Sequence, residues 1–230
     1  MSPFYQLPKN WQWTVAILGL GSGIGMLILY VVLLIKVGVI LAILSFFFMI
    51  PIVQFLQTPF MTLRGQYQYV SPMLLVFGAS DAKYDLHNGT SFDYWYMMRK
   101  VPSGIKARQV MLVYYLQGLL EIIRRLEAEE VPLTLEISGT SYFFSESTAE
   151  RLGFEVGKPD SGLFFNLIIN YLDLLWMYSY AQGKLAFPKL STSKKAKITG
   201  EKLLEGKASM ERLYKRLASR VDHFLIPPTS

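Results

Sequence analysis

Two long apolar segments near the start of the chain dominate its hydrophobic pattern. Residues 11–35 are almost continuously apolar, and residues 39–60 are apolar again apart from a few polar positions and Pro51. Each segment matches the roughly 20 residues that a helix needs to cross a hydrocarbon layer of ~30 Å. Because only residues 36–38 separate them, the pattern predicts a tight membrane-spanning helical hairpin over residues 1–62.

The residues around these segments refine the prediction. A second apolar segment follows the first at once, without a small-residue cleavage site, which argues against a removable signal peptide. Lys9, Arg64 and the basic remainder of the chain outweigh Lys36 at the turn. The positive-inside rule therefore places both termini and the soluble domain in the cytoplasm, as for a protein of the bacterial inner membrane.

The first apolar segment also carries alternating glycines. They suit close helix packing, either within the hairpin or against another membrane subunit. These glycines are Gly19, Gly21, Gly23 and Gly25.

Residues 63–190 show the mixed periodicities of a small α/β domain. Apolar runs and alternating patterns predict strands, and apolar positions at spacings of three and four predict a long helix. The predicted elements are, in order, a strand at 67–77, a loop at 81–90, a short buried element at 92–98, a helix at 105–130, a strand at 133–138 that continues through 142–144, a short helix at 145–152 and a strand at 154–156.

Residues 163–181 form a third apolar segment, but it carries a polar stripe. Asn166, Asn170 and Asp173 recur at helical spacing, and such groups are costly in lipid. Two interpretations stay open: a helix packed on the domain or lying in the membrane interface, and a third span with a buried polar face. The remaining residues, 191–230, are predicted to form a tail with a basic linker and an amphipathic helix over 201–221.

Charge and composition limit the chemistry and the partners. The net charge is +6, and the chain has no cysteine, which excludes disulfides and thiolate catalysis. The basic residues of the tail helix favour anionic lipid headgroups or an acidic partner, or simply form a solvated face. No nucleic-acid-reading module accompanies them, so we predict no nucleic-acid partner.

The order strand, loop, long helix, strand and short helix, with Thr-Ala-Glu-Arg-Leu-Gly-Phe at 148–154, resembles the second half of the GNAT acetyltransferase family. The resemblance covers about residues 100–156 and implies a GNAT-like fold and acyl transfer from coenzyme A. In that family, backbone amides of a glycine-rich loop before the long helix bind the pyrophosphate of the cofactor. The matching stretch here, 102–107, has a single glycine. The resemblance implies cofactor contacts at Gly104, Lys106 and Arg108 and a proton donor at Tyr142.

A polar cluster between apolar elements is the other candidate for chemistry. It places His87 between the carboxylates of Asp85 and Asp93. A histidine flanked by carboxylates suits a general base or half of a metal site, but no further ligand is identifiable, so we predict no metal. The alternative is a turn at Asn88 stabilised by Asx hydrogen bonds. Residues 138–141, Ser-Gly-Thr-Ser, suit an anion site or a β-bulge.

These patterns predict a hairpin-anchored, cytoplasm-facing α/β protein that acts without a cofactor as a non-catalytic subunit of a membrane complex. Its predicted partners are the lipid bilayer and a protein in the membrane. Two alternatives stay open: a membrane-tethered N-acyltransferase that uses acyl-coenzyme A, and a protein that binds lipid headgroups.

Overall fold

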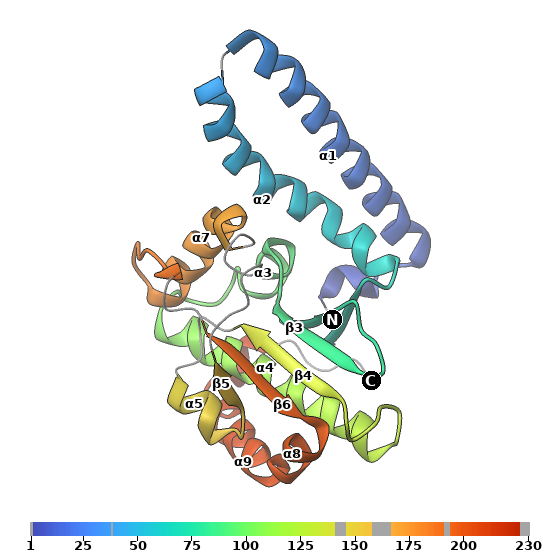
Figure 1. Ribbon diagram of the computed structural model, residues 1–230, viewed down its shortest axis with the longest axis vertical. Helices are drawn as coiled ribbons and strands as arrows, with labels where there is room; N and C mark the ends of the chain where they lie inside the picture. Colours follow the sequence, from blue (N-terminus) through green and yellow to red (C-terminus); the bar gives the residue numbers. More distant parts are fainter. Residues whose placement is uncertain (1, 38, 141–145, 158–166, 191–193, 226–230) are drawn as a thin grey trace.

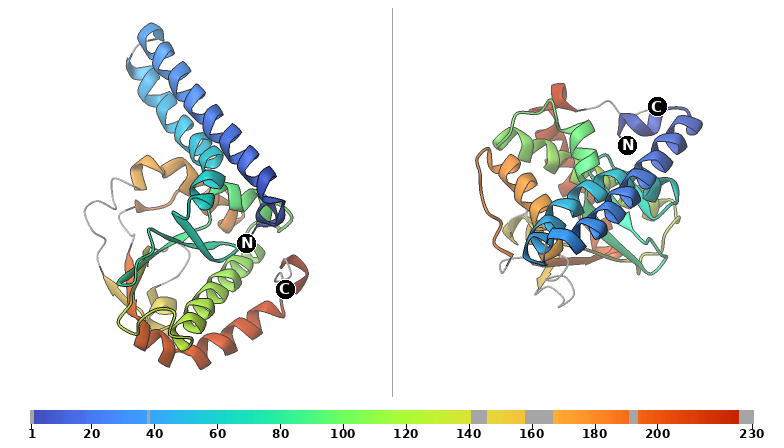
Figure 2. Two further views of the ribbon diagram at one scale, coloured as in Figure 1. Left: turned by 90° about the vertical axis from the view of Figure 1, so that its right-hand side faces the viewer. Right: turned by 90° about the horizontal axis from the view of Figure 1, so that it is seen from above.

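A long helical hairpin stands on an α/β domain (Figure 1). The computed structural model describes residues 2–37, 39–140, 146–157, 167–190 and 194–225. A short 3-10 helix η1 (Pro3–Gln6) is followed by α1 (Lys9–Val37) and α2 (Val39–Leu63), which pack against each other in opposite directions (Figure 2). The predicted pair of apolar hairpin helices is therefore confirmed.

Both hairpin helices are long and apolar enough, by length and composition, to cross a membrane. The candidate spans are Lys9–Leu34 and Ser45–Leu63, with mean hydropathies of 2.4 and 1.5. Most of their described side chains are exposed rather than packed in the protein. Because apolar side chains favour an apolar surrounding, exposure of this kind suits a lipid environment.

One glycine of α1 determines how closely the two helices approach. A Cβ atom at Gly19 would lie 2.6 Å from the carbonyl oxygen of Leu56 on α2, whereas Gly21 and Gly25 have no neighbouring atom within 4 Å. Close packing within the hairpin therefore depends on Gly19, and the other glycines do not share its role.

A six-stranded mixed sheet forms the frame of the domain, with the strand order β1-β2-β3-β4-β6-β5. The strands are β1 (Tyr67–Ser71), β2 (Leu74–Phe77), β3 (Lys83–Asn88), β4 (Glu136–Thr140), β5 (Glu155–Gly157) and β6 (Lys195–Thr199). Neighbouring strands are antiparallel except β3 and β4, which are parallel. A parallel pair needs a crossover connection, and the long helix α4 (Ile105–Glu127) provides it.

The core lies between the sheet and α4. Apolar residues at spacings of three and four give α4 one buried face, including Val110, Leu116 and Ile123. The helices α8 (Gly200–Glu205) and α9 (Lys207–Ala218), followed by η3 (Asp222–Phe224), pack on the domain away from the hairpin (Figures 1 and 2). The basic residues of α9 therefore do not lie alongside the hairpin helices.

Two further helices lie between the sheet and the hairpin: α3 (Ser91–Met97) and α7 (Tyr171–Gln182). Both contact α2, and α7 also contacts α4. At 12 residues, α7 is shorter than the roughly 20 residues that a span requires. Within the described part of 163–181, the packed or interfacial interpretation therefore fits and a third span does not. Asn166 lies outside the described residues.

The predicted strands around residue 80 are wrong in two places. The polar stretch 81–90, predicted as a loop, contains β3, because Tyr84 and Leu86 face the core while Asp85 and His87 alternate to the other face. The single strand predicted at 67–77 is two antiparallel strands, β1 and β2, which turn at Pro72 and Met73.

The elements predicted for the tail, residues 191–230, also differ from those in the structure. The basic stretch predicted as a linker contains β6, which pairs with both β4 and β5 and buries Ile198. The single helix predicted at 201–221 is divided at Gly206 into α8 and α9. The tail is thus joined to the sheet.

The central part of the prediction is confirmed. The long helix is α4, the short helix is α5 (Glu146–Arg151), and Gly153, with φ +89°, ends it before β5. The short buried element is α3, and the strand predicted at 133–138 is β4, shifted to Glu136–Thr140. The predicted continuation at 142–144 lies outside the described residues.

Candidate functional site

The parallel ladder between β3 and β4 ends close to the carboxyl ends of both described strands. Their ladder runs from the pair Lys83 and Glu136 to the pair Leu86 and Gly139. Beyond it, His87 and Asn88 pair with β2, and Thr140 pairs with β6. A Cβ atom at Gly139 would lie 3.2 Å from the carbonyl oxygen of Leu86, so a side chain there would crowd the last pair.

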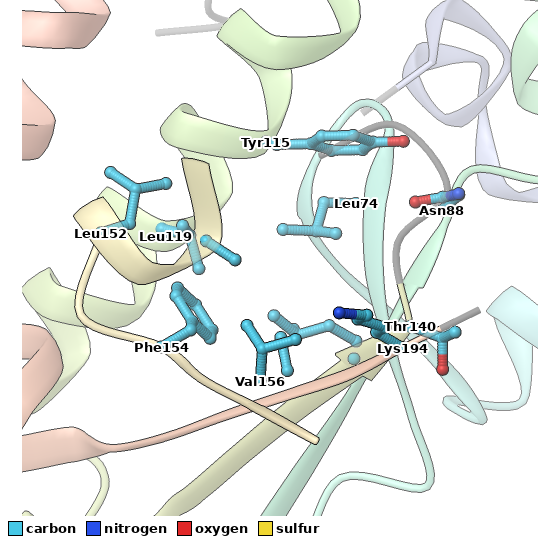
Figure 3. Close-up of a pocket in the computed structure, with 13 residues that line it drawn as sticks. Leu74, Asn88, Tyr115, Leu119, Thr140, Leu152, Phe154, Val156 and Lys194 are labelled. Carbon is cyan, nitrogen blue, oxygen red and sulfur yellow. The ribbon is translucent and has the colours of Figure 1, made fainter. Parts of the chain in front are cut away.

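A cavity of about 260 Å³ lies at this end of the ladder, between the sheet, α4 and α5 (Figure 3). We call it the sheet cavity. Its apolar side chains gather on one side and its polar groups on the other, as Figure 3 shows. The apolar side includes Leu119, Leu152, Phe154 and Val156, and the polar side includes Asn88, Tyr115, Thr140 and Lys194.

The polar side of the sheet cavity offers neutral groups and one cation. Burial, followed by the nearby Tyr94, raises the pKa of Tyr115 well above its usual value, so its phenol stays neutral at physiological pH. Lys194 is exposed and brings a positive charge to the rim. The volume lies just below the ~300–1,000 Å³ typical of ligand pockets. The cavity therefore suits a short apolar chain with a carbonyl or anionic head.

A second cavity, of about 530 Å³, lies between α2, α3 and α7. We call it the hairpin cavity. Apolar residues of α2, from Pro51 to Leu56, form one wall, and the only charged side chains among its described lining residues are Arg99 and Asp173.

Asp85 and His87 come together on the sheet face opposite α4. Asp85 Oδ2 lies 3.2 Å from His87 Nε2, and Ser138 Oγ donates a hydrogen bond to Asp85 Oδ1 at 3.4 Å. Partial burial acts to raise the pKa of Asp85, but His87 together with Lys83 and Lys195 outweighs it, and the pKa is lowered. Both side chains are about half exposed, and neither lines a cavity.

Asp93, predicted in the same cluster, has a separate environment. It caps α3, where its Oδ2 accepts hydrogen bonds from Tyr69 O–H at 2.8 Å and from Thr90 N–H at 2.7 Å. Burial raises its pKa to about 6, although these donors act to lower it. The Thr90 hydroxyl lies 3.3 Å from that of Thr58 on α2. Asp93 therefore belongs to the joint between the hairpin and the domain.

The residues implied for coenzyme A lie at the start of α4. Gly104 has φ +85°, and its N–H donates a hydrogen bond to the Tyr180 carbonyl at 2.8 Å. The carboxyl end of α7 thus covers the start of α4, with Gly183 against Gly104. The side chains of Lys106 and Arg108 are exposed and line neither cavity. Tyr142 lies outside the described residues.

The cavity residues themselves were missed from the sequence. Tyr115 and Leu119 share the helical periodicity of core residues, and Lys194 stood in a predicted linker. Gly139 was the sequence signal that could have indicated this cavity, since a glycine inside a strand marks a close backbone approach. Among the described residues, no group of histidines and carboxylates could hold a metal ion.

The fold and the two cavities described above are the basis for a proposed function. The resemblance to the GNAT family stays a prediction. Comparison of the chain with protein-family models, curated proteins and solved structures finds no match.

Proposed function

We propose that this protein is anchored in a membrane by its hairpin and that its α/β domain binds the acyl part of an amphipathic ligand in the sheet cavity. The observation that carries the proposal is the division of that cavity into an apolar side and a polar side with a lysine. An apolar chain removes its own surface and that of the cavity from water, while the head remains at the polar rim.

Binding without catalysis fits the site better than transfer does. The histidine and carboxylate that were candidates for general-base catalysis lie on the other face of the sheet. The amide of Gly104 is already bonded to Tyr180, which removes a donor that the pyrophosphate of coenzyme A would use.

Acyl transfer is the second candidate, and the order of elements favours it. The chain runs β3, α4, β4, α5 and β5, the order on which the resemblance to GNAT enzymes rests. An acyl thioester would place its acyl group in the sheet cavity under either proposal. Release of free thiol from an acyl thioester in the presence of amine acceptors would separate transfer from binding.

The test is calorimetric titration of the full chain in detergent with octanoate and octanoyl-coenzyme A. Ala149→Leu places a larger side chain against the sheet cavity and should abolish binding, whereas Ala208→Leu on the exposed face of α9 should not. Lys194→Gln should weaken binding of the anionic head by about tenfold, or ~1.4 kcal/mol. No saturable binding of either probe up to about 1 mM, or unchanged binding by Ala149→Leu, would refute the proposal.

The role as a subunit of a membrane complex stays a separate prediction. It requires a partner that co-purifies in a fixed ratio after mild solubilisation of native membranes. The basic face of α9 is the surface that an acidic partner would use.

A further inference from the structure

The hairpin cavity combines a wall at the depth of the lipid chains with a polar end in the domain. Its α2 wall, from Pro51 to Leu56, falls inside the candidate span Ser45–Leu63. The opposite walls come from α3 and α7, which lie beside the lower part of α2 in Figure 1. A molecule in this cavity would therefore reach from the hydrocarbon layer to the surface of the α/β domain.

Two tryptophans place the cavity at the boundary between lipid and water. Trp95 is 59% exposed and Trp176 is 39% exposed, although both line the cavity. Tryptophan is enriched at membrane interfaces, where its apolar ring and its N–H group both find suitable surroundings. The cavity thus extends across the boundary between the lipid chains and the headgroups.

The polar end holds a buried carboxylate, that of Asp173. Asp173 is only 7% exposed, and its Oδ1 accepts hydrogen bonds from Ser91 Oγ at 2.5 Å and from Trp176 Nε1 at 3.0 Å. It forms no ion pair within the described residues. Because a buried carboxylate is costly unless a cation accompanies it, this site favours a positively charged ligand group.

Arg99 adds the opposite charge to the same cavity. It is exposed and, like Asp173, has no ion pair among the residues that the structure describes. A guanidinium binds phosphate oxygens in pairs, while an ammonium group donates up to three hydrogen bonds to a carboxylate. One carboxylate and one guanidinium therefore match a headgroup that carries both a phosphate and an amine.

We propose that the hairpin cavity binds an amine-bearing zwitterionic phospholipid of the bilayer. Its ammonium group lies at Asp173, its phosphate at Arg99, and one acyl chain follows the apolar wall of α2. A lipid without the amine leaves Asp173 unpaired, and a choline headgroup has no N–H to donate to it. The inference rests on the membrane anchoring in the proposed function, but it does not depend on the sheet cavity.

The test uses the tryptophans as reporters. The chain has four, so a background with Trp11→Phe and Trp13→Phe leaves fluorescence only from Trp95 and Trp176. The full chain is reconstituted in vesicles that contain increasing fractions of brominated phosphatidylethanolamine, phosphatidylglycerol or phosphatidylcholine. Half-maximal quenching is expected at about tenfold lower fraction of the ethanolamine lipid, equivalent to ~1.4 kcal/mol of preference.

Two variants assign the preference to the cavity. Asp173→Asn keeps the oxygen that accepts from Ser91 and Trp176 but removes the charge, and it should abolish the preference for the ethanolamine lipid. Arg99→Gln should weaken quenching by all three phospholipids, whereas Lys100→Gln, at a neighbouring exposed position outside the cavity lining, should not.

The quenching results separate the lipid site from the membrane anchoring. Equal quenching by all three lipids, or an unchanged preference in Asp173→Asn, overturns the lipid site but leaves the membrane anchoring intact. No quenching by any brominated lipid overturns the anchoring as well, and with it the first part of the proposed function.

Discussion

Asp93 should make the stability of the protein fall as pH rises, against the usual behaviour of carboxylates. Its side chain is fully buried, its Oδ1 has no hydrogen-bond partner within the described structure, and burial raises its pKa from 3.8 to about 6. An acid whose pKa is raised by folding stabilises the folded state fully below its unfolded pKa. That stability is lost as pH rises through the folded value. Each pKa unit is equivalent to 1.36 kcal/mol, so the full loss is about 3 kcal/mol, of which about 2.4 kcal/mol falls between pH 4 and pH 7.

The variant Asp93→Asn removes this titration and keeps an oxygen that accepts from Thr90 N–H and Tyr69 O–H. We expect its stability relative to the wild type to increase by about 2.4 kcal/mol between pH 4 and pH 7.5, because other titrating groups cancel in the difference. For a chain of this size, that corresponds to roughly 5–10 °C in Tm. Thermal unfolding of both proteins in one detergent, followed by circular dichroism, measures it.

The amide also leaves Nδ2 without an acceptor, so the absolute stability at one pH is less informative than the slope with pH. Asp81→Asn, at an exposed position, serves as the control and should show no comparable slope. The reasoning fails if the difference between Asp93→Asn and the wild type is independent of pH, or if the variant loses relative stability as pH rises.

Three further predictions test the joints of the structure. Gly19→Leu should destabilise the hairpin by about 2 kcal/mol or more, because its side chain meets the Leu56 carbonyl, whereas Gly21→Leu should change thermal stability by less than about 0.5 kcal/mol. Gly104→Ala should lower the free energy of unfolding by about 1–2 kcal/mol, because φ +85° strains any residue with a Cβ; an unchanged Tm would contradict this. The chain has no cysteine, so single cysteines introduced at positions 36 and 80 should label with an impermeant maleimide from opposite sides of the membrane, and labelling from one side would exclude a hairpin that crosses twice.

The hairpin and α4 were predictable because their signals are local. Twenty or more apolar residues, or apolar positions at spacings of three and four, determine an element without knowledge of its neighbours. The strand β3 could not be predicted in this way. Its outward-facing Asp85 and His87, followed by the turn dipeptide Asn88-Gly89, have the composition of a loop. Its inward-facing Tyr84 and Leu86 are recognisable as core residues only once α4 is known to cover them.

The candidate sites depend on contacts that the sequence does not display. Asp93 lies six residues after His87, yet a change from strand to helix gives the two side chains different partners. The hairpin cavity joins α2 to Asp173, more than one hundred residues later. The apolar lining of both cavities has the composition of an ordinary core, so composition alone could not distinguish a cavity from packed interior.

The position of β6 has a consequence for biosynthesis. This strand lies between β4 and β5, although it is translated after both. Until residues 195–199 have left the ribosome, β4 has an unpaired edge and β5 has no neighbour in the sheet, and such edges invite pairing with other chains. By then a membrane-inserted hairpin would already hold the nascent domain at the bilayer, where its diffusion is confined to the plane of the membrane. Anchoring would then limit the chains that the unfinished domain can meet while it folds to those at the same membrane.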